Sequence, residues 1–144
     1  MSYYIGIDIG TSSVKAMLIN ENEIQNTISK DYPIYLSNGN YAEQNPEDWY
    51  RQSMLAMKEL LRDVDKSEVK AIGFCGQMHG LVLLDEKDEV IRPAILWNDG
   101  RSEKEVDYLN NKIGKDFLLD NTGNIAFAGF TAPKLLWVYN HEPD

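Results

Sequence analysis

The sequence predicts an α/β fold whose sheet opens with an antiparallel three-stranded meander and is flanked by helices. Two patterns point to this fold class: short alternating apolar runs fill residues 3–32, and apolar residues at helical spacing follow from residue 46. The chain has 144 residues, of which 43% are hydrophobic and 26% are charged. That length and composition are typical of one folded domain with a hydrophobic core.

The meander is predicted from three runs near the start of the chain. Residues 3–9 and 13–19 are apolar or alternating, and a glycine with two hydroxylated residues separates them. Such spacing is typical of a β-hairpin. A third alternating run, residues 23–32, follows a polar turn at residues 20–22, so the sheet is expected to continue in antiparallel order.

A helix is predicted over residues 46–62. Asn45 is a favourable N-cap and Pro46 suits the first helical position, where a missing N–H costs little. Apolar residues at helical spacing are expected to pack into the core rather than to form a cofactor site. They are Trp49, Met54, Met57, Leu60 and Leu61.

The next apolar run, residues 69–75, predicts a buried strand that ends in a polar loop at residues 76–80. Such loops often carry binding residues. Cys75, with apolar neighbours, is expected to be a buried and unreactive thiol. A single cysteine also cannot build a disulfide framework.

The remaining elements follow from turn residues and short apolar patterns. Glycine and asparagine mark the loops, and Pro133 suits the first turn of a helix. The predicted segments are a loop at 33–40, apolar runs at 81–84 and 93–97, and helical segments at 102–113, 117–120 and 132–139.

The charge balance and the composition exclude several classes of partner. The formal net charge is -9, whereas general nucleic-acid binding needs clustered Lys and Arg. No apolar run is long enough to span a bilayer, and the first residues lack the pattern of a signal peptide. We therefore expect a cytoplasmic protein with neither a nucleic-acid nor a membrane partner.

The turn between the first two strands is the first candidate site. Gly10, Thr11, Ser12 and Ser13 can direct backbone N–H groups and hydroxyls into one concave anion site. Lys15 adds a cation if strand alternation turns it to the same side. The alternative is a plain hairpin whose hydroxyls satisfy the turn backbone.

Asp8 precedes this turn at the end of a strand that is expected to be buried, where an unpaired carboxylate is costly. A natural partner is Mg2+, which keeps several waters and binds one or two carboxylates together with phosphate oxygens. The alternative is a local role in capping the turn.

A second candidate site is suggested by the loop after the strand at 69–75. His79 offers a hydrogen-bond donor and an acceptor for a polar ligand, and Met78 offers an adaptable apolar wall. The alternative is a histidine that nearby backbone satisfies. Trp97 can provide an aromatic face, and Asp99 and Arg101 can provide fixed polar groups for a ligand. Asp99 and Arg101 could equally form an ion pair within their loop.

Four segments resemble known sequence motifs. Residues 8–15 resemble the first phosphate motif of the actin, Hsp70 and sugar-kinase superfamily. Residues 76–80, 93–101 and 129–137 narrow the resemblance to the FGGY carbohydrate kinases, and among these to the xylulokinases. The resemblance implies a ribonuclease H-like, actin-like ATPase lobe with a mixed sheet, and residues 1–144 would be part of the N-terminal lobe.

The resemblance also implies a reaction, in which ATP with Mg2+ phosphorylates D-xylulose to D-xylulose 5-phosphate. By motif, Asp8 would lie near Mg2+ and the phosphates, and it would contact the ion through a water molecule. The nucleotide-phosphate residues would be Gly10, Thr11, Ser12, Ser13 and Lys15, and the sugar contacts would be Gln77, Met78, His79 and Trp97.

The resemblance places the catalytic base, the second phosphate motif and the C-terminal lobe beyond residue 144. We therefore expect this chain to be a truncated lobe that does not turn over alone. A truncated lobe exposes sheet edge and interlobe surface, so homo-oligomer formation through that surface is also expected.

Two alternatives remain open at this point. One is an FGGY kinase for another substrate, such as ribulose, gluconate or glycerol. The other is a non-catalytic, actin-like nucleotide-binding module that acts in assembly or interaction.

Overall fold

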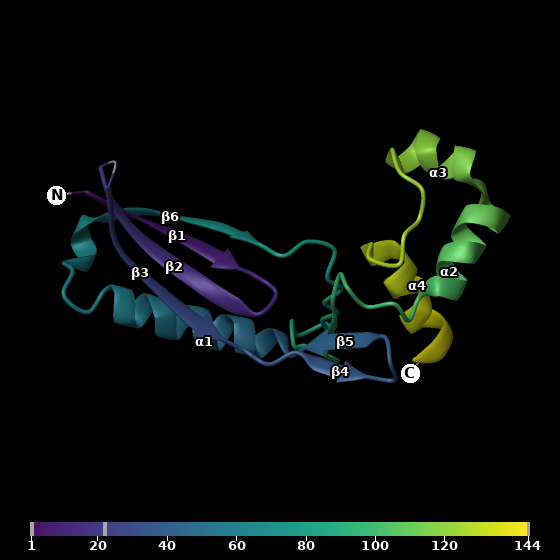
Figure 1. Ribbon diagram of the computed structural model, residues 1–144, viewed down its shortest axis with the longest axis horizontal. Coiled ribbons are helices and arrows are strands. Elements are labelled where there is room, and N and C mark those ends of the chain that lie inside the picture. The colour runs from purple at the N-terminus through teal and green to yellow at the C-terminus, as the bar shows by residue number, and fades with distance from the viewer. Residues whose placement is uncertain (1, 22, 144) are drawn as a thin grey trace. The chain divides into compact units, whose positions relative to one another are not determined.

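The computed structural model describes residues 2–21 and 23–143 (Figure 1). Its contacts divide the chain into two compact units. The first unit combines residues 1–33 with 45–77, and the second combines residues 34–44 with 78–144. Each unit is described by itself below.

A four-stranded mixed sheet forms the first unit. Its strands are β1 (Tyr3–Ile9), β2 (Ser13–Asn20), β3 (Glu23–Asp31) and β6 (Val69–Gly76), in the order β3-β2-β1-β6. The first three pair antiparallel, whereas β6 pairs parallel to β1. The predicted meander is therefore confirmed, and the sheet is mixed.

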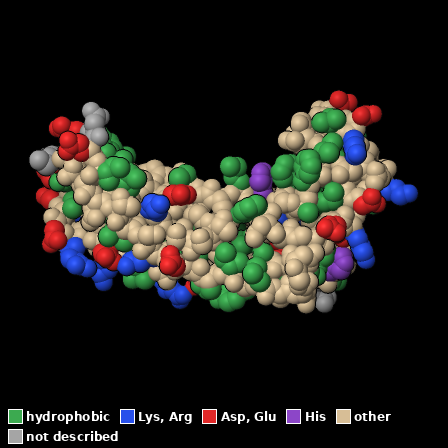
Figure 2. Space-filling view, viewed as in Figure 1, with side chains coloured by type: hydrophobic (Ala, Val, Ile, Leu, Met, Phe, Trp, Pro, Cys, Tyr) green, Lys and Arg blue, Asp and Glu red, His purple; other side chains and the backbone are tan. Residues whose placement is uncertain are grey.

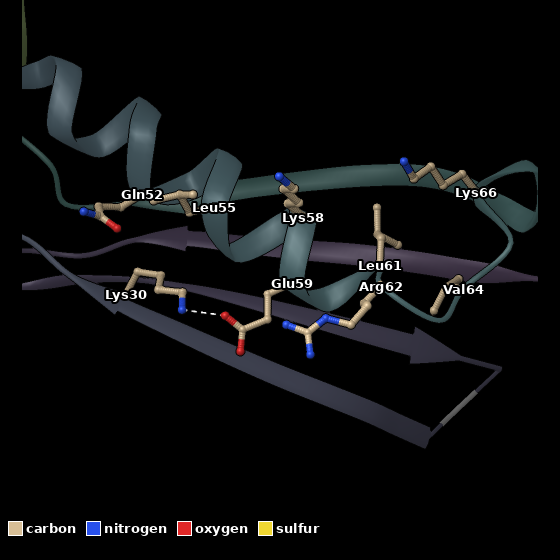
Figure 3. A pocket seen from close by; sticks show the side chains of 9 residues that line it. All are labelled: Lys30, Gln52, Leu55, Lys58, Glu59, Leu61, Arg62, Val64 and Lys66. Carbon is tan, nitrogen blue, oxygen red and sulfur yellow. Dashed lines mark hydrogen bonds and ion pairs between the residues drawn. The ribbon is translucent and has the colours of Figure 1, made fainter.

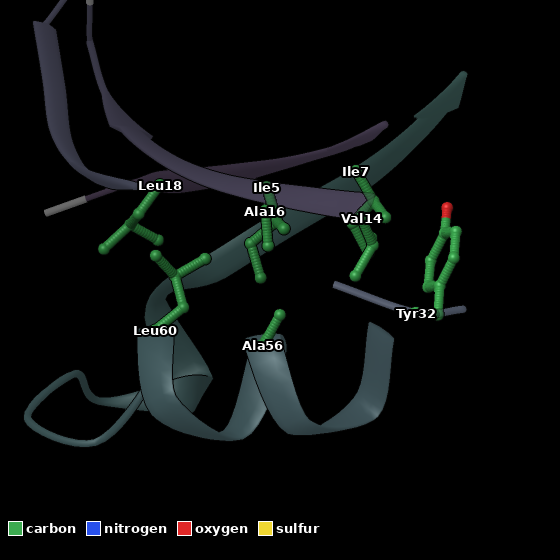
Figure 4. Close-up of a cluster of buried hydrophobic side chains, with 8 residues drawn as sticks. All are labelled: Ile5, Ile7, Val14, Ala16, Leu18, Tyr32, Ala56 and Leu60. Carbon is green, nitrogen blue, oxygen red and sulfur yellow. The ribbon is translucent and has the colours of Figure 1, made fainter. Parts of the chain in front are cut away.

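Helix α1 (Pro46–Leu60) packs on one face of this sheet, mainly against β2 and β3. The Asn45 side chain caps it by accepting a hydrogen bond from the Glu47 N–H at 3.1 Å. Figure 4 shows Ala56 and Leu60 pointing from the helix toward the sheet. The buried cluster comprises Ile5, Ile7, Val14, Ala16, Leu18, Tyr32, Ala56 and Leu60.

Burial was predicted wrongly for one residue of α1 and for strand β6. Met54 is 45% exposed, because the face of α1 that packs on the sheet passes through Ser53, Ala56 and Leu60 instead. Strand β6 was predicted to be buried, yet Phe74 is 69% exposed. Among the described residues it pairs with β1 alone and forms the edge of the sheet, and α1 lies over the other strands.

The second unit contains a small antiparallel sheet and several helices. The strands are β4 (Tyr35–Ser37), β5 (Tyr41–Gln44) and β7 (Ala94–Ile95), in the order β4-β5-β7. The loop predicted at residues 33–40 is thus partly strand. Its Asn and Gly residues form the turn, where Asn38 and Gly39 both have positive φ.

The helices of the second unit are α2 (Glu103–Tyr108), α3 (Lys115–Thr122) and α4 (Thr131–His141), with a π-helical segment (Leu109–Gly114) between α2 and α3. The predicted helices are confirmed in type, although residues 102–113 change from α to π geometry. Leu81, Ile95 and Trp137 form the buried cluster. None of the helices in the described part of the chain is long and apolar enough to cross a membrane.

Candidate functional site

The turn between β1 and β2 is held by a buried tyrosine. The Gly10 N–H donates to the Ser13 carbonyl at 3.0 Å, which closes the turn. The Tyr32 N–H donates to the Ser12 carbonyl at 3.2 Å, and the Tyr32 hydroxyl donates to the Gly10 carbonyl. Burial, followed by the nearby charge of Asp8, raises the pKa of Tyr32 to about 12, so the hydroxyl remains a donor.

Sequence reasoning missed Tyr32, which stands one residue after β3. The contact joins positions that are 22 residues apart, and local pattern does not reveal such pairs. One sequence signal could have indicated this contact. Tyr32 has an aromatic ring with a polar hydroxyl, and it follows a predicted strand that runs back toward the turn.

Asp8 and Lys15 lie directly opposite each other on β1 and β2. Directly opposed residues of an antiparallel pair point to the same face, so the condition set for Lys15, that it lie on the side of Asp8, is met. Both residues line a hollow of about 380 Å³ together with Met17 and Phe74. This places a carboxylate and an ammonium group beside the turn.

Asp8 itself is exposed, which corrects the expectation of a buried strand end. Ile5 and Ile7 point to the face that α1 covers, and strand alternation turns Asp8 to the opposite face. Its carboxylate is therefore available to a ligand from solvent.

Cys75 is exposed, so the predicted buried thiol is wrong. It pairs with Asp8 in the parallel register of β1 and β6, on the sheet face opposite α1. Local desolvation, then a hydrogen bond to Asp8 and its negative charge, raise the pKa of the Cys75 thiol. The group is exposed but is held in its less nucleophilic form.

The donor set near the turn suits a hydrated metal ion. Among the described residues, no group of three or more His, Cys, Asp or Glu side chains converges on one point. Asp8 offers a single carboxylate at the edge of the hollow. A single carboxylate fits an ion such as Mg2+, which retains waters and takes further ligands from phosphate oxygens.

Gln77 adds one backbone hydrogen bond to those that join β1 and β6, just after the end of β6. Its N–H donates to the Ile9 carbonyl at 2.8 Å. A Cβ on Gly76 would lie 2.7 Å from the same oxygen, so this close approach requires glycine. The backbone of Gln77 is thereby fixed beside the first residue of the turn.

The second unit holds the other predicted sugar residues. Met78 is 71% exposed and Trp97 is 47% exposed. His79 has a φ of 60°, in the left-handed region, and its ring stacks on Phe130 with centroids 4.6 Å apart. A cavity of about 290 Å³ lies beside His79 and Phe130, and Asn124 and Thr131 contribute polar groups to its wall.

A buried lysine underlies this group. Lys134 is fully buried on α4, and its Nζ donates to the His79 carbonyl at 2.7 Å and to the Gly129 carbonyl at 2.6 Å. Burial lowers the pKa of Lys134 to about 8, while the charge of Asp99 acts in the opposite direction. In the sequence, Lys134 lies within the motif at residues 129–137, and the sequence alone predicted no role for it.

Asp99 and Arg101 form a buried ion pair. Arg101 Nε donates to Asp99 Oδ1 at 2.9 Å, and its Nη2 donates to Oδ2 at 2.8 Å. Asp99 Oδ2 also accepts the Ala42 N–H at 2.6 Å, and the guanidinium lies 3.9 Å from the Tyr41 ring centroid. These contacts favour the ion-pair interpretation over a sugar contact.

A larger hollow of the first unit lies elsewhere. It measures about 710 Å³ and extends between β3 and α1, where Lys30 and Glu59 form an ion pair at 2.5 Å (Figure 3). Lys and Arg side chains gather along the edge where α1 runs (Figure 2). None of the residues from 8 to 15 lines this hollow, so it is separate from the turn.

Residues 3–144 match the N-terminal domain of the FGGY family of carbohydrate kinases. The chain is 48% identical over 147 aligned residues to a xylulose kinase of Bacillus subtilis (strain 168), covering 100% of this chain and 29% of that protein.

Solved structures agree with this match. A xyloylose kinase from Brucella ovis has a TM-score of 0.91 at 41% identity, with 99% of this chain and 30% of that chain covered. A gluconate kinase from Lactobacillus acidophilus has a TM-score of 0.92 at 27% identity, with 99% and 29% covered. The chain thus spans about 30% of the length of the relatives it matches. The family match covers residues 3–144, and the solved relatives share the fold with its mixed sheet. The chain therefore belongs to the FGGY family of carbohydrate kinases.

Proposed function

We propose that the chain is part of an ATP-dependent kinase that phosphorylates D-xylulose to D-xylulose 5-phosphate. The observation that carries the proposal is that Asp8 and Lys15 lie opposite each other on β1 and β2, beside a turn whose backbone is hydrogen-bonded to Tyr32. The similarity to xylulose kinases supports the choice of sugar.

The turn is proposed to receive the nucleotide phosphates. Thr11, Ser12 and Ser13 would present N–H groups and hydroxyls to phosphate oxygens, and Gly10, whose own N–H closes the turn, would let the phosphate approach the backbone closely. Binding of this kind needs no net positive charge on the protein. Lys15 would add a charge-assisted hydrogen bond from the same face as Asp8.

Asp8 is proposed to orient a water ligand of Mg2+. When bound, Mg2+ supplies charge neutralisation for the phosphates during transfer. The role of the protein would then be to position the nucleotide phosphates. Tyr32 would hold the turn in place, and Lys15 would bind a phosphate oxygen.

The sugar is proposed to contact Gln77, Met78, His79 and Trp97. His79 can exchange hydrogen bonds with hydroxyls, while Met78 and Trp97 provide exposed apolar surface against the carbon skeleton. The base that takes the proton of the attacking hydroxyl is proposed to lie outside these residues, and the isolated chain would then bind ligands without turnover.

A kinase for another sugar or sugar acid is the second candidate. The similarity to a gluconate kinase favours it, although the identity of 27% is lower than the 48% to a xylulose kinase. A non-catalytic nucleotide-binding module is the remaining alternative.

The deciding experiment measures kcat/KM of the full-length protein for D-xylulose, D-ribulose, D-gluconate and glycerol with ATP and Mg2+. We expect D-xylulose to give the highest value, and Asp8→Asn to abolish most of the activity. A higher value for another substrate would move the assignment to that substrate. ATP binding with no phosphorylation of any of them would favour the non-catalytic module.

A further inference from the structure

His79 has a backbone conformation that requires support. Its φ of 60° lies in the left-handed region, which non-glycine residues adopt only at a free-energy cost. The residue belongs to no helix or strand, so no regular hydrogen-bond ladder fixes it. A contact from elsewhere must hold the peptide in place.

Lys134 supplies such a contact. Its ammonium group reaches the His79 carbonyl at 2.7 Å across 55 positions of the sequence. The acceptor is the main-chain oxygen, so this bond restrains the peptide after His79 and leaves the imidazole to meet a ligand.

The second bond of Lys134 extends the restraint to the partner of the histidine ring. Nζ also donates to the Gly129 carbonyl at 2.6 Å, and the next residue, Phe130, stacks on His79. Both sides of the stacked pair are therefore tied to one ammonium group.

Trp97 is connected to the same point through Gly129. A Cβ on Gly129 would lie 2.8 Å from the Trp97 carbonyl oxygen, so the two backbones touch and only glycine fits. A shift of residue 129 would consequently press on the backbone of Trp97.

We propose that Lys134 is a positioning residue for sugar binding, which sets the backbone of His79 and, through Gly129, that of Trp97. The inference rests on the proposed function, because it assumes that these residues contact the sugar.

The chemistry of the site favours positioning over simple packing. A fully buried ammonium group is costly to desolvate. An apolar side chain of similar length could occupy the same interior space beside α4 without that cost. Only a donor can satisfy the two carbonyl oxygens at once. Burial lowers the pKa of Lys134 to about 8, which reflects this cost.

The test compares three variants of the full-length protein. Lys134→Met removes both hydrogen bonds, and Gly129→Ala displaces one acceptor while it keeps the lysine. Leu81→Ala is the control, since Leu81 is buried in the same unit and contributes no hydrogen bond from its side chain.

We expect Lys134→Met and Gly129→Ala to raise the KM for the sugar about tenfold or more, with the KM for ATP unchanged. Leu81→Ala should lower the melting temperature and leave both KM values unchanged. An unchanged sugar KM in either folded variant, or an equal rise in Leu81→Ala, overturns the proposal. If Lys134→Met fails to fold, Lys134→Gln, which keeps a hydrogen-bond donor but no charge, takes its place in the comparison, and an unchanged sugar KM in that folded variant together with an unchanged KM in Gly129→Ala overturns the proposal.

A wild-type protein that phosphorylates none of the tested sugars would refute the proposed function instead. Hydrogen exchange then tests Lys134 without substrate. Faster exchange at residues 79 and 80 in Lys134→Met than in Leu81→Ala would support the positioning role, and equal exchange would overturn it.

Discussion

The hydroxyl of Tyr32 donates a hydrogen bond to the carbonyl oxygen of Gly10, and thereby supports the turn from the buried side of the sheet. The same residue donates its N–H to the Ser12 carbonyl at 3.2 Å. The conformation of the turn thus depends on a residue that no motif includes.

Tyr32→Phe should destabilise the protein and weaken nucleotide binding. It removes the donor to the Gly10 carbonyl, and an unpaired buried acceptor costs about 1–3 kcal/mol. Urea unfolding measures the stability, and ATP titration measures the affinity. Tyr4→Phe, at an exposed position of β1, is the control and should change neither quantity. Unchanged ATP affinity in Tyr32→Phe would show that the Tyr32 hydroxyl does not contribute to nucleotide binding.

Lys15→Met should raise the KM for ATP about tenfold or more and leave the KM for the sugar unchanged. The expected loss is that of one charge-assisted hydrogen bond to phosphate. Lys30→Met is the matched control, because Lys30 belongs to the same sheet and pairs with Glu59 in the separate hollow. Equal effects of the two substitutions on steady-state kinetics would contradict a specific role for Lys15.

The stability of the wild type relative to Lys134→Met should rise as the pH increases above about 8. The pKa of Lys134 is lowered from 10.5 to about 8 in the folded protein, so the unfolded chain binds more protons between these values. The burial penalty is fully present below pH 8 and disappears toward pH 10.5, a change of roughly 3 kcal/mol. Denaturant unfolding at pH 7, 8.5 and 10 measures it, and parallel curves for the two proteins would refute the assignment.

Arg101→Met should destabilise the protein by about 3–5 kcal/mol, because it leaves the Asp99 carboxylate buried without its cation. The double variant Asp99→Asn with Arg101→Met should recover part of that loss. Chemical denaturation of both variants measures the coupling. If the loss of Arg101 raised the sugar KM without lowering stability, the sugar-contact interpretation would return.

The 144-residue chain should self-associate through the open side of β6. This strand pairs only with β1, and Ile72 and Phe74 are exposed on it. Phe74→Ser should shift the chain toward the monomer in sedimentation experiments, whereas Tyr139→Ser, at an exposed position of α4, should not. A wild-type chain that stays monomeric at high concentration would show that this surface does not mediate association.

Local pattern predicted the elements whose causes are local. The alternation of residues 3–32 was sufficient for the meander, and Asn45 with Pro46 was sufficient for the start of α1. The burial of residues 69–75 was mispredicted because an apolar sequence indicates a strand but does not show whether another element covers it.

The candidate site divides in the same way. Alternation left the side of Lys15 as a condition, and the register of β1 and β2 puts it on the same face as Asp8. The contacts of Tyr32 with Gly10 and of Lys134 with His79 join residues 22 and 55 positions apart, and only the folded chain shows them.

The exposed position of Cys75 has a practical consequence for spectroscopy. It is the one cysteine among these 144 residues, and it pairs across the sheet with Asp8. A fluorophore attached to this thiol would sit beside the hollow that Asp8 and Lys15 line, and its emission could report the arrival of a nucleotide in real time. Because the pKa of the thiol is raised, labelling should proceed faster in mildly alkaline buffer, where the thiolate is more abundant.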